Sequence, residues 1–159
     1  MYTSQPPAID SLWDSGTWKN IPALEIDCFR KESSSHRPQT RCKLLYDREI
    51  IYGIFHVIDQ YVRCVHTEFQ SEVYKDSCVE FFLQPKASSN YFNFEFNCGG
   101  ALLASYVTDP TRIDGKVREF IPLTPEDNRE IKRYSSLPAT VESEITRPIT
   151  WFLGFSIPF

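Results

Sequence analysis

The chain has 159 residues and a formal net charge of -4 at pH 7. A length of this order suits one domain with a sizeable hydrophobic core, so we expect residues 1–159 to form a single domain. The acidic balance argues against a nucleic-acid partner, which would be bound through its phosphates. Because no apolar run is long enough for a transmembrane helix, we expect no membrane span.

The N-terminal segment MYTSQPPAID has neither the basic region nor the apolar region of a signal peptide. Either the protein is cytosolic or a signal peptide has been removed.

The cysteines are not spaced for metal binding. None forms a CxxC pair and no histidine lies at a zinc-finger spacing from them, which argues against a structural zinc site. Cysteines placed in this way are typically buried free thiols. One disulfide remains open, but its pairing does not follow from the sequence. The five cysteines are Cys28, Cys42, Cys64, Cys78 and Cys98.

Short runs typical of strands fill the first half of the chain. Ala23–Phe29 alternates apolar and polar residues. Thr40–Tyr46 and Ile50–Val57, separated by a short polar turn, predict a hairpin. Gly53 lies inside the second of these strands and indicates a bulge or a close backbone contact. Tyr61–Thr67 is a further candidate strand.

The central part of the chain carries the most regular pattern. Three strands are predicted there, over Ser77–Gln84, Tyr91–Cys98 and Ala101–Val107. In the middle strand, alternate residues point to opposite faces of the sheet. One face is apolar, with Phe92, Phe94, Phe96 and Cys98, and the other is polar, with Tyr91, Asn93, Glu95 and Asn97.

Gly99-Gly100 predicts a tight hairpin loop of two residues, because both glycines can adopt a positive φ. This loop would place Cys98 opposite Ala101, and would put Tyr106 on the polar face opposite Asn93. Across the other edge of the middle strand, we place Glu80 beside Glu95 and Asn97.

The predicted polar face suits a sugar ligand. Amides and carboxylates form hydrogen bonds with sugar hydroxyls, and the C–H face of a pyranose packs on an aromatic ring. The alternative is a polar sheet face whose cross-strand hydrogen bonds are already satisfied. The residues concerned are Glu80, Asn93, Glu95 and Asn97, edged by Tyr91 and Tyr106.

The last third of the chain begins with a long turn-rich region, Thr108–Pro138, in which Pro125–Lys132 predicts a helical turn. Ala139–Ile145 and Trp151–Ile157 are typical of strands. Many short strands without a long helix predict an all-β fold, an antiparallel β-sandwich or jelly roll. Because the chain ends on an apolar strand, we also consider a domain truncated at Phe159.

Two runs in the central region, VYKDSCVEFFLQP and YFNFEFNCGG, resemble the family 9 carbohydrate-binding modules, and most closely a divergent family 9-like group. The segments ALEID, LLYDREIIYGIFHVID and TWFLGFSIPF support the resemblance. It implies a β-sandwich that binds oligo- or polysaccharide without cleaving it, as an accessory to glycan degradation. It also implies a glycoside hydrolase as partner and an extracellular or periplasmic location.

The resemblance also implies particular ligand contacts. They are the aromatic residue ahead of the DSCVE run, Tyr74, the glutamate of that run, Glu80, and polar residues of the next strand. Glu95 stands where typical members have an arginine, and a second stacking tryptophan normally lies in a part of the family that follows Phe159.

Family members also bind structural calcium, for which Asp59 and Asp76 are the candidate oxygen ligands here.

Two other functions compete with sugar binding. Glu80 and Glu95 on neighbouring strands would have the carboxylate spacing of a retaining glycosidase, although an open face lacks the enclosure that raises a catalytic pKa. The other alternative is a structural or protein-interaction sandwich whose sugar site has decayed. We therefore predict a protein that is not an enzyme and assign no catalytic residues.

Overall fold

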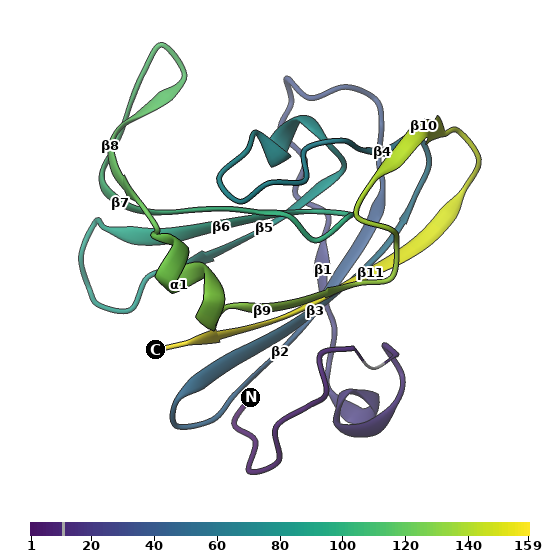
Figure 1. The fold of residues 1–159 in the computed structure, drawn as a ribbon, viewed down its shortest axis with the longest axis horizontal. Helices are drawn as coiled ribbons and strands as arrows, with labels where there is room; N and C mark the ends of the chain where they lie inside the picture. The colour runs from purple at the N-terminus through teal and green to yellow at the C-terminus, as the bar shows by residue number, and fades with distance from the viewer. Residues whose placement is uncertain (11) are drawn as a thin grey trace.

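Antiparallel sheets form the layers of the computed structural model, which describes residues 1–10 and 12–159 (Figure 1). This arrangement confirms the predicted β-sandwich. One sheet has the order β1 (Leu24–Ile26), β2 (Gln39–Tyr46), β3 (Ile50–Asp59), β11 (Ile149–Pro158) and β9 (Lys132–Ser135). The other has the order β5 (Cys78–Leu83), β6 (Tyr91–Asn97), β7 (Leu102–Ile113) and β8 (Lys116–Pro122).

The main core lies between these two sheets and centres on Phe155 of β11. The Phe155 ring lies 5.2 Å from the ring of Phe96 and 5.3 Å from that of Phe81, both in the four-stranded sheet. Gly53 of β3 is opposite Phe155, and a Cβ atom there would lie 2.2 Å from the Phe155 ring. The close contact predicted at Gly53 is therefore confirmed, and it makes room for the central aromatic ring.

A second apolar cluster covers the outer face of the five-stranded sheet. Trp13 and Trp18 of the N-terminal segment are buried there, and Trp18 belongs to a 3₁₀ helix, η1 (Gly16–Asn20). The buried Lys43 ammonium donates to the carbonyl oxygens of both tryptophans and lies over the Trp13 ring. The N-terminal segment thus belongs to the folded unit.

The turn between β6 and β7 differs from the predicted two-residue loop. Asn97 N–H donates to Ala101, so the loop contains Cys98, Gly99 and Gly100. Gly100 has φ +90°, which suits the left-handed position of a three-residue hairpin loop. The extra residue shifts the register by one, so Tyr106 pairs with Phe92 and faces the core. The predicted placement of Tyr106 on the polar face is therefore wrong.

The region predicted as one long turn-rich segment contains regular structure. β7 continues to Ile113 and pairs with β8, and their hairpin projects beyond the sheet (Figure 1). The predicted helical turn is confirmed as α1 (Pro125–Glu130), whose N-cap is Thr124. The Thr124 side chain and the Asp127 carboxylate form a capping box, which satisfies N–H groups at the helix start.

A small third sheet pairs β10 (Val141–Ile145) with β4 (Val62–Cys64), so the strand predicted over Tyr61–Thr67 is shorter than expected. β11 is flanked by β3 on one side and by β9 on the other.

All five cysteines are free thiols. Among the helices of the described residues, none combines the length and the apolar character that crossing a membrane requires.

Candidate functional site

A groove of about 530 Å³ lies on the outer face of the four-stranded sheet, the face that points away from the other sheet. Asn93 and Glu95 of β6 line it together with Ser105 of β7. Tyr74 lines it from the segment before β5, and Phe120 lines it from β8. Gln70, Leu103, Ala104, Val107, Lys116, Val117 and Pro122 complete the lining. The groove therefore presents polar groups on its strands and exposed aromatic rings from two separate segments.

The segment that carries Tyr74 is tied to the sheet by Gln70. The Gln70 amide donates to the carbonyl oxygens of Ala104 and Leu123 and accepts from Ala104 N–H at 3.0 Å. The Gln70 side chain thus bridges β7 and the residue after β8, where Leu123 N–H also donates to Ala104 O at 3.0 Å. Tyr74 follows within the 3₁₀ helix η2 (Val73–Lys75) and is 51% exposed, so its ring is free to contact a ligand.

Asp76 and Asn97, together with the backbone at Val65 and His66, form a buried polar node directly after the segment that carries Tyr74. The Asp76 carboxylate accepts hydrogen bonds from the N–H groups of Val65 and His66 and from the Asn97 amide at 2.9 Å. Burial alone raises the pKa of Asp76, but these hydrogen bonds outweigh it and hold that pKa below its usual range. The side chains of Asp76 and Asn97 are fully buried.

Asn97 therefore does not reach the groove, in contrast to its predicted role as a ligand contact. Its amide also donates to His66 O at 2.7 Å and accepts from Ala101 N–H at 2.9 Å. With these partners Asn97 positions the strand end and the β6–β7 loop.

Glu80 and Glu95 lie directly opposite each other on β5 and β6, as predicted. Burial is the largest cause that raises the pKa of Glu95, to about 6, and the Glu80 charge adds to it. The Asn93 amide acts in the other direction through a hydrogen bond of 2.7 Å to Glu95. Burial also raises the pKa of Glu80. The expectation that an open face would leave these pKa values unshifted is wrong.

Glu80 does not line the groove, and the two remaining predicted contacts also lie outside it. Tyr91 is on the same face as Glu95, but its ring lies 5.7 Å from the ring of Phe82. Tyr106 is on the opposite face, where its ring lies 4.7 Å from that of Phe92. Phe120 was not predicted as a ligand contact. An aromatic residue that follows charged residues in a turn-rich region is the sequence feature that could have indicated it.

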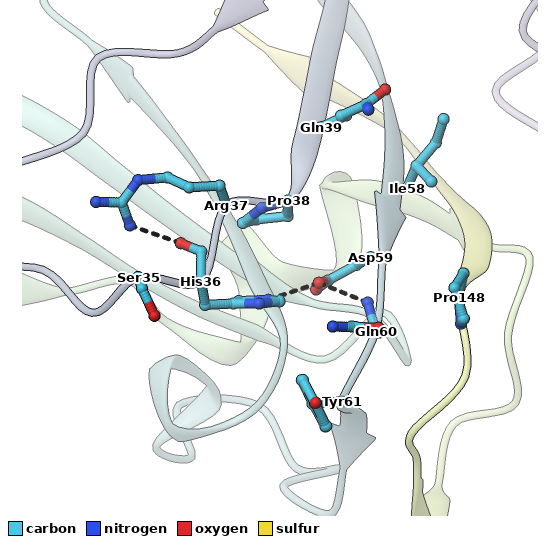
Figure 2. Close-up of a pocket in the computed structure, with 10 residues that line it drawn as sticks. All are labelled: Ser35, His36, Arg37, Pro38, Gln39, Ile58, Asp59, Gln60, Tyr61 and Pro148. Atoms are coloured by element: carbon cyan, nitrogen blue, oxygen red, sulfur yellow. Dashed lines mark hydrogen bonds and ion pairs between the residues drawn. The ribbon is translucent and has the colours of Figure 1, made fainter.

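Asp59 and Asp76, the candidate calcium ligands, line one cavity together with His36 and Glu144, and both carboxylates already have hydrogen-bonding partners. The His36 imidazole lies 2.6 Å from an Asp59 carboxylate oxygen at the edge of a polar cavity away from the groove, and the same oxygen accepts from Gln60 N–H (Figure 2). Asp76 is occupied by N–H donors, as described above. Carboxylates that accept from N–H groups in this way offer few free oxygen lone pairs to a cation.

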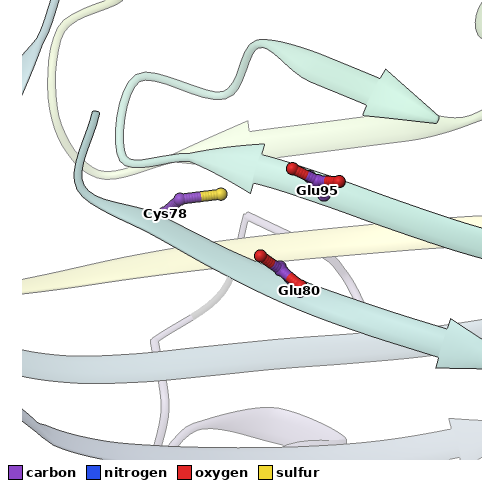
Figure 3. A group of neighbouring side chains, drawn as sticks. All are labelled: Cys78, Glu80 and Glu95. Carbon is purple, nitrogen blue, oxygen red and sulfur yellow. The ribbon is translucent and has the colours of Figure 1, made fainter. Parts of the chain in front are cut away.

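One group of three potential metal ligands occurs in residues 1–10 and 12–159, and it lies at the acidic pair. Ligand atoms of Cys78, Glu80 and Glu95 lie within 4.8 Å of one another (Figure 3). Calcium takes oxygen ligands, so the thiol makes this group a poor calcium site.

An antiparallel β-sandwich with a groove on one sheet that combines exposed aromatic rings with a few polar side chains is typical of carbohydrate-binding modules. The chain belongs to carbohydrate-binding family 9, because the model of that family matches residues 10–159. This match confirms the resemblance that the two central runs indicated.

Two solved structures are similar to the chain. One is a protein of Bacteroides uniformis described as a candidate carbohydrate-binding protein, with 28% identity and a TM-score of 0.76 over 88% of this chain. The other is a family 9 module of Caldicellulosiruptor kristjanssonii in complex with glucose, with 16% identity and a TM-score of 0.56 over 100% of this chain. The chain spans 61% of the first structure and 68% of the second. No curated protein matches it.

Proposed function

We propose that the chain binds the sugar units of an oligo- or polysaccharide in the outer-face groove without cleaving them. The observation that carries this proposal is the joint placement of Tyr74, Asn93 and Glu95 in one groove. A sugar ring stacked on Tyr74 brings its hydroxyls to the amide of Asn93 and the carboxylate of Glu95.

Phe120 supports the proposal because it supplies a second exposed aromatic ring to the groove. It is 52% exposed and comes from β8, whereas Tyr74 comes from η2. Sugars bound by aromatic side chains commonly use the apolar C–H faces of their rings, which two rings recognise better than one.

The wider role that we propose is accessory to glycan degradation, outside the cell, beside a glycoside hydrolase. Family membership supports this role, since the modules of the family bind sugars and do not cleave them. Asp59 and Asp76 already accept hydrogen bonds from N–H groups, so we propose no structural calcium there.

The acidic pair keeps a glycoside hydrolase as a second candidate. Glu80 and Glu95 face each other, and burial with the Glu80 charge raises the pKa of Glu95 to about 6, as a general acid requires. If the chain were a hydrolase, it would release reducing sugar from a glycan, and Glu95→Gln would abolish that release. We expect no release from either form.

Isothermal titration against glucose, xylose, mannose, galactose and their oligomers tests sugar binding. We expect saturable binding to one sugar class, at least tenfold weaker in Tyr74→Ala. Tyr134→Ala is the matched control, because Tyr134 is 40% exposed on β9 and does not line the groove. Equal loss in both variants, or no binding of any sugar, would contradict the proposed function.

A further inference from the structure

Two buried thiols from segments far apart in the sequence meet behind the polar node. Cys64 ends β4 and Cys98 follows β6, and both are 0% exposed. Each thiol lies against the backbone next to the other cysteine. Cys98 Sγ is 3.7 Å from the carbonyl oxygen of Arg63, and a Cβ added at Gly99 would lie 2.5 Å from Cys64 Sγ.

The two thiols also interact directly. Burial is the main cause that raises the pKa of each, while their mutual hydrogen bond lowers the pKa of Cys64 and raises that of Cys98. The Cys64 thiol donates to the carbonyl oxygen of Ala139 at 3.2 Å, and this oxygen also lies against Gly99, the residue after Cys98.

The other cysteines are less suited to pairing. Cys28 is exposed. Cys42 is buried, and this burial raises its pKa to about 12. Cys78 lies on the outer face beside Glu80 and Glu95. Cys98 affects the pKa of Cys78 only through its charge, without a hydrogen bond between the two thiols.

We propose that Cys64 and Cys98 are a modification site that forms a disulfide when the chain folds in the presence of a disulfide oxidant. Both thiols lose their protons, an S–S bond forms, and the two electrons reduce one molecule of oxidised glutathione to two of glutathione. The sequence left the pairing of one disulfide open, and the structure assigns it to these two residues.

The disulfide would reinforce the base of the groove. Cys98 N–H donates to Ser77 O at 2.7 Å, and Ser77 N–H donates to Arg63 O at 3.0 Å, so the two cysteines flank an existing cross-link. Asp76 and Asn97 are the immediate neighbours of Ser77 and Cys98. A covalent bond here restricts the unfolded chain and holds together the segments that carry Tyr74 and the β6–β7 loop.

The test refolds the reduced, unfolded chain in a mixture of oxidised and reduced glutathione. The oxidant can then reach both thiols before folding buries them. Thiol titration in denaturant and peptide mapping without reductant follow. We expect the count of free thiols to fall from five to three, with Cys64 linked to Cys98. Cys78→Ser, the matched control, should form the same link, and the thermal midpoint of the oxidised wild type should exceed that of the reduced form.

Two results would overturn the proposal. One is a folded chain that keeps five free thiols after refolding with the oxidant. The other is a link that joins Cys98 to Cys78. Because sugar titration does not enter this experiment, its outcome is independent of the proposed function.

Discussion

Glu80 and Glu95 are a directly facing pair of carboxylates on the outer face of the four-stranded sheet. In the part of the chain that the structure describes, neither carboxylate has a lysine or arginine within ion-pair distance. Burial therefore raises both pKa values, and the charges of Arg112 and Arg30 oppose this only partly at Glu80. A ligand hydroxyl that donates a hydrogen bond to a carboxylate oxygen would restore hydrogen bonding that the oxygen loses when burial displaces water.

The raised pKa of Glu95 makes stability depend on pH. In the folded chain the pKa is about 6, above the ordinary 4.5, so the folded state holds this proton more tightly. Stability from this group is complete below pH 4.5 and is lost as pH rises through about 6. We expect Glu95→Gln to be more stable than the wild type by about 1 kcal/mol at about pH 8, after allowance for partial hydration.

Urea unfolding of both forms, at about pH 4.5 and about pH 8, measures this difference. The two forms should have equal stability at the lower pH. A wild type that is the more stable form at about pH 8 would show that Glu95 has a favourable charged partner instead.

The charge of Glu80 is one cause of the raised Glu95 pKa, so Glu80→Gln should move that pKa downward. The side-chain carboxyl signal of Glu95, followed by NMR across the pH range, reports the midpoint. Glu142→Gln, an exposed change on β10, is the control and should leave the midpoint at about 6. An unchanged midpoint in Glu80→Gln would mean that burial alone sets the pKa of Glu95.

Asn97 and Asn93 lie on the same strand face but have opposite expected roles. Asn97→Ala leaves the buried Asp76 carboxylate, His66 O and Ala101 N–H with fewer partners, so we expect a loss of about 3 kcal/mol in the free energy of unfolding. Asn93→Ala should change stability by less than about 1 kcal/mol but weaken sugar binding. Chemical unfolding and titration of both variants separate the two roles, and the reverse pattern would contradict this assignment.

Gly53 is expected to tolerate no side chain. A methyl group there would meet the Phe155 ring at 2.2 Å, inside the core between the sheets. Overpacking of this kind costs about 1–3 kcal/mol, so Gly53→Ala should lower the midpoint of urea unfolding. Gly115→Ala meets no atom within 4 Å and serves as a comparison for the glycine change, although its φ of +79° adds some strain. Wild-type stability in Gly53→Ala would show that Phe155 can move aside.

Calcium removal is expected to leave the fold unchanged, because N–H donors and His36 already occupy Asp59 and Asp76. Thermal unfolding with EDTA and with added calcium measures this directly. A thermal midpoint that rises with calcium would contradict this expectation.

Period-2 alternation was enough to predict the two faces of β6 and to place Glu80 on the same face as Glu95, because a strand offers only two faces. It was not enough to place Tyr106. Gly99 and Gly100 fit both a two-residue and a three-residue loop, and one extra residue turns every side chain of β7 to the other face.

Two features of the site depend on contacts between distant segments and were not predictable from local pattern. Asn97 is buried because η2 and the residues before it fold over the end of β6, which alternation does not reveal. Phe120 joins the groove because β7 and β8 pair within a region whose charged residues obscured the strand pattern.

Backbone amide NMR during titration with the sugar class found by calorimetry tests directly whether the groove binds sugar. We expect saturable shifts that cluster at Tyr74, Asn93, Glu95 and Phe120, and that disappear in Tyr74→Ala. Shifts confined to the cavity beside His36 and Asp59, or no shifts with any sugar, would contradict the assignment of the groove as the sugar site.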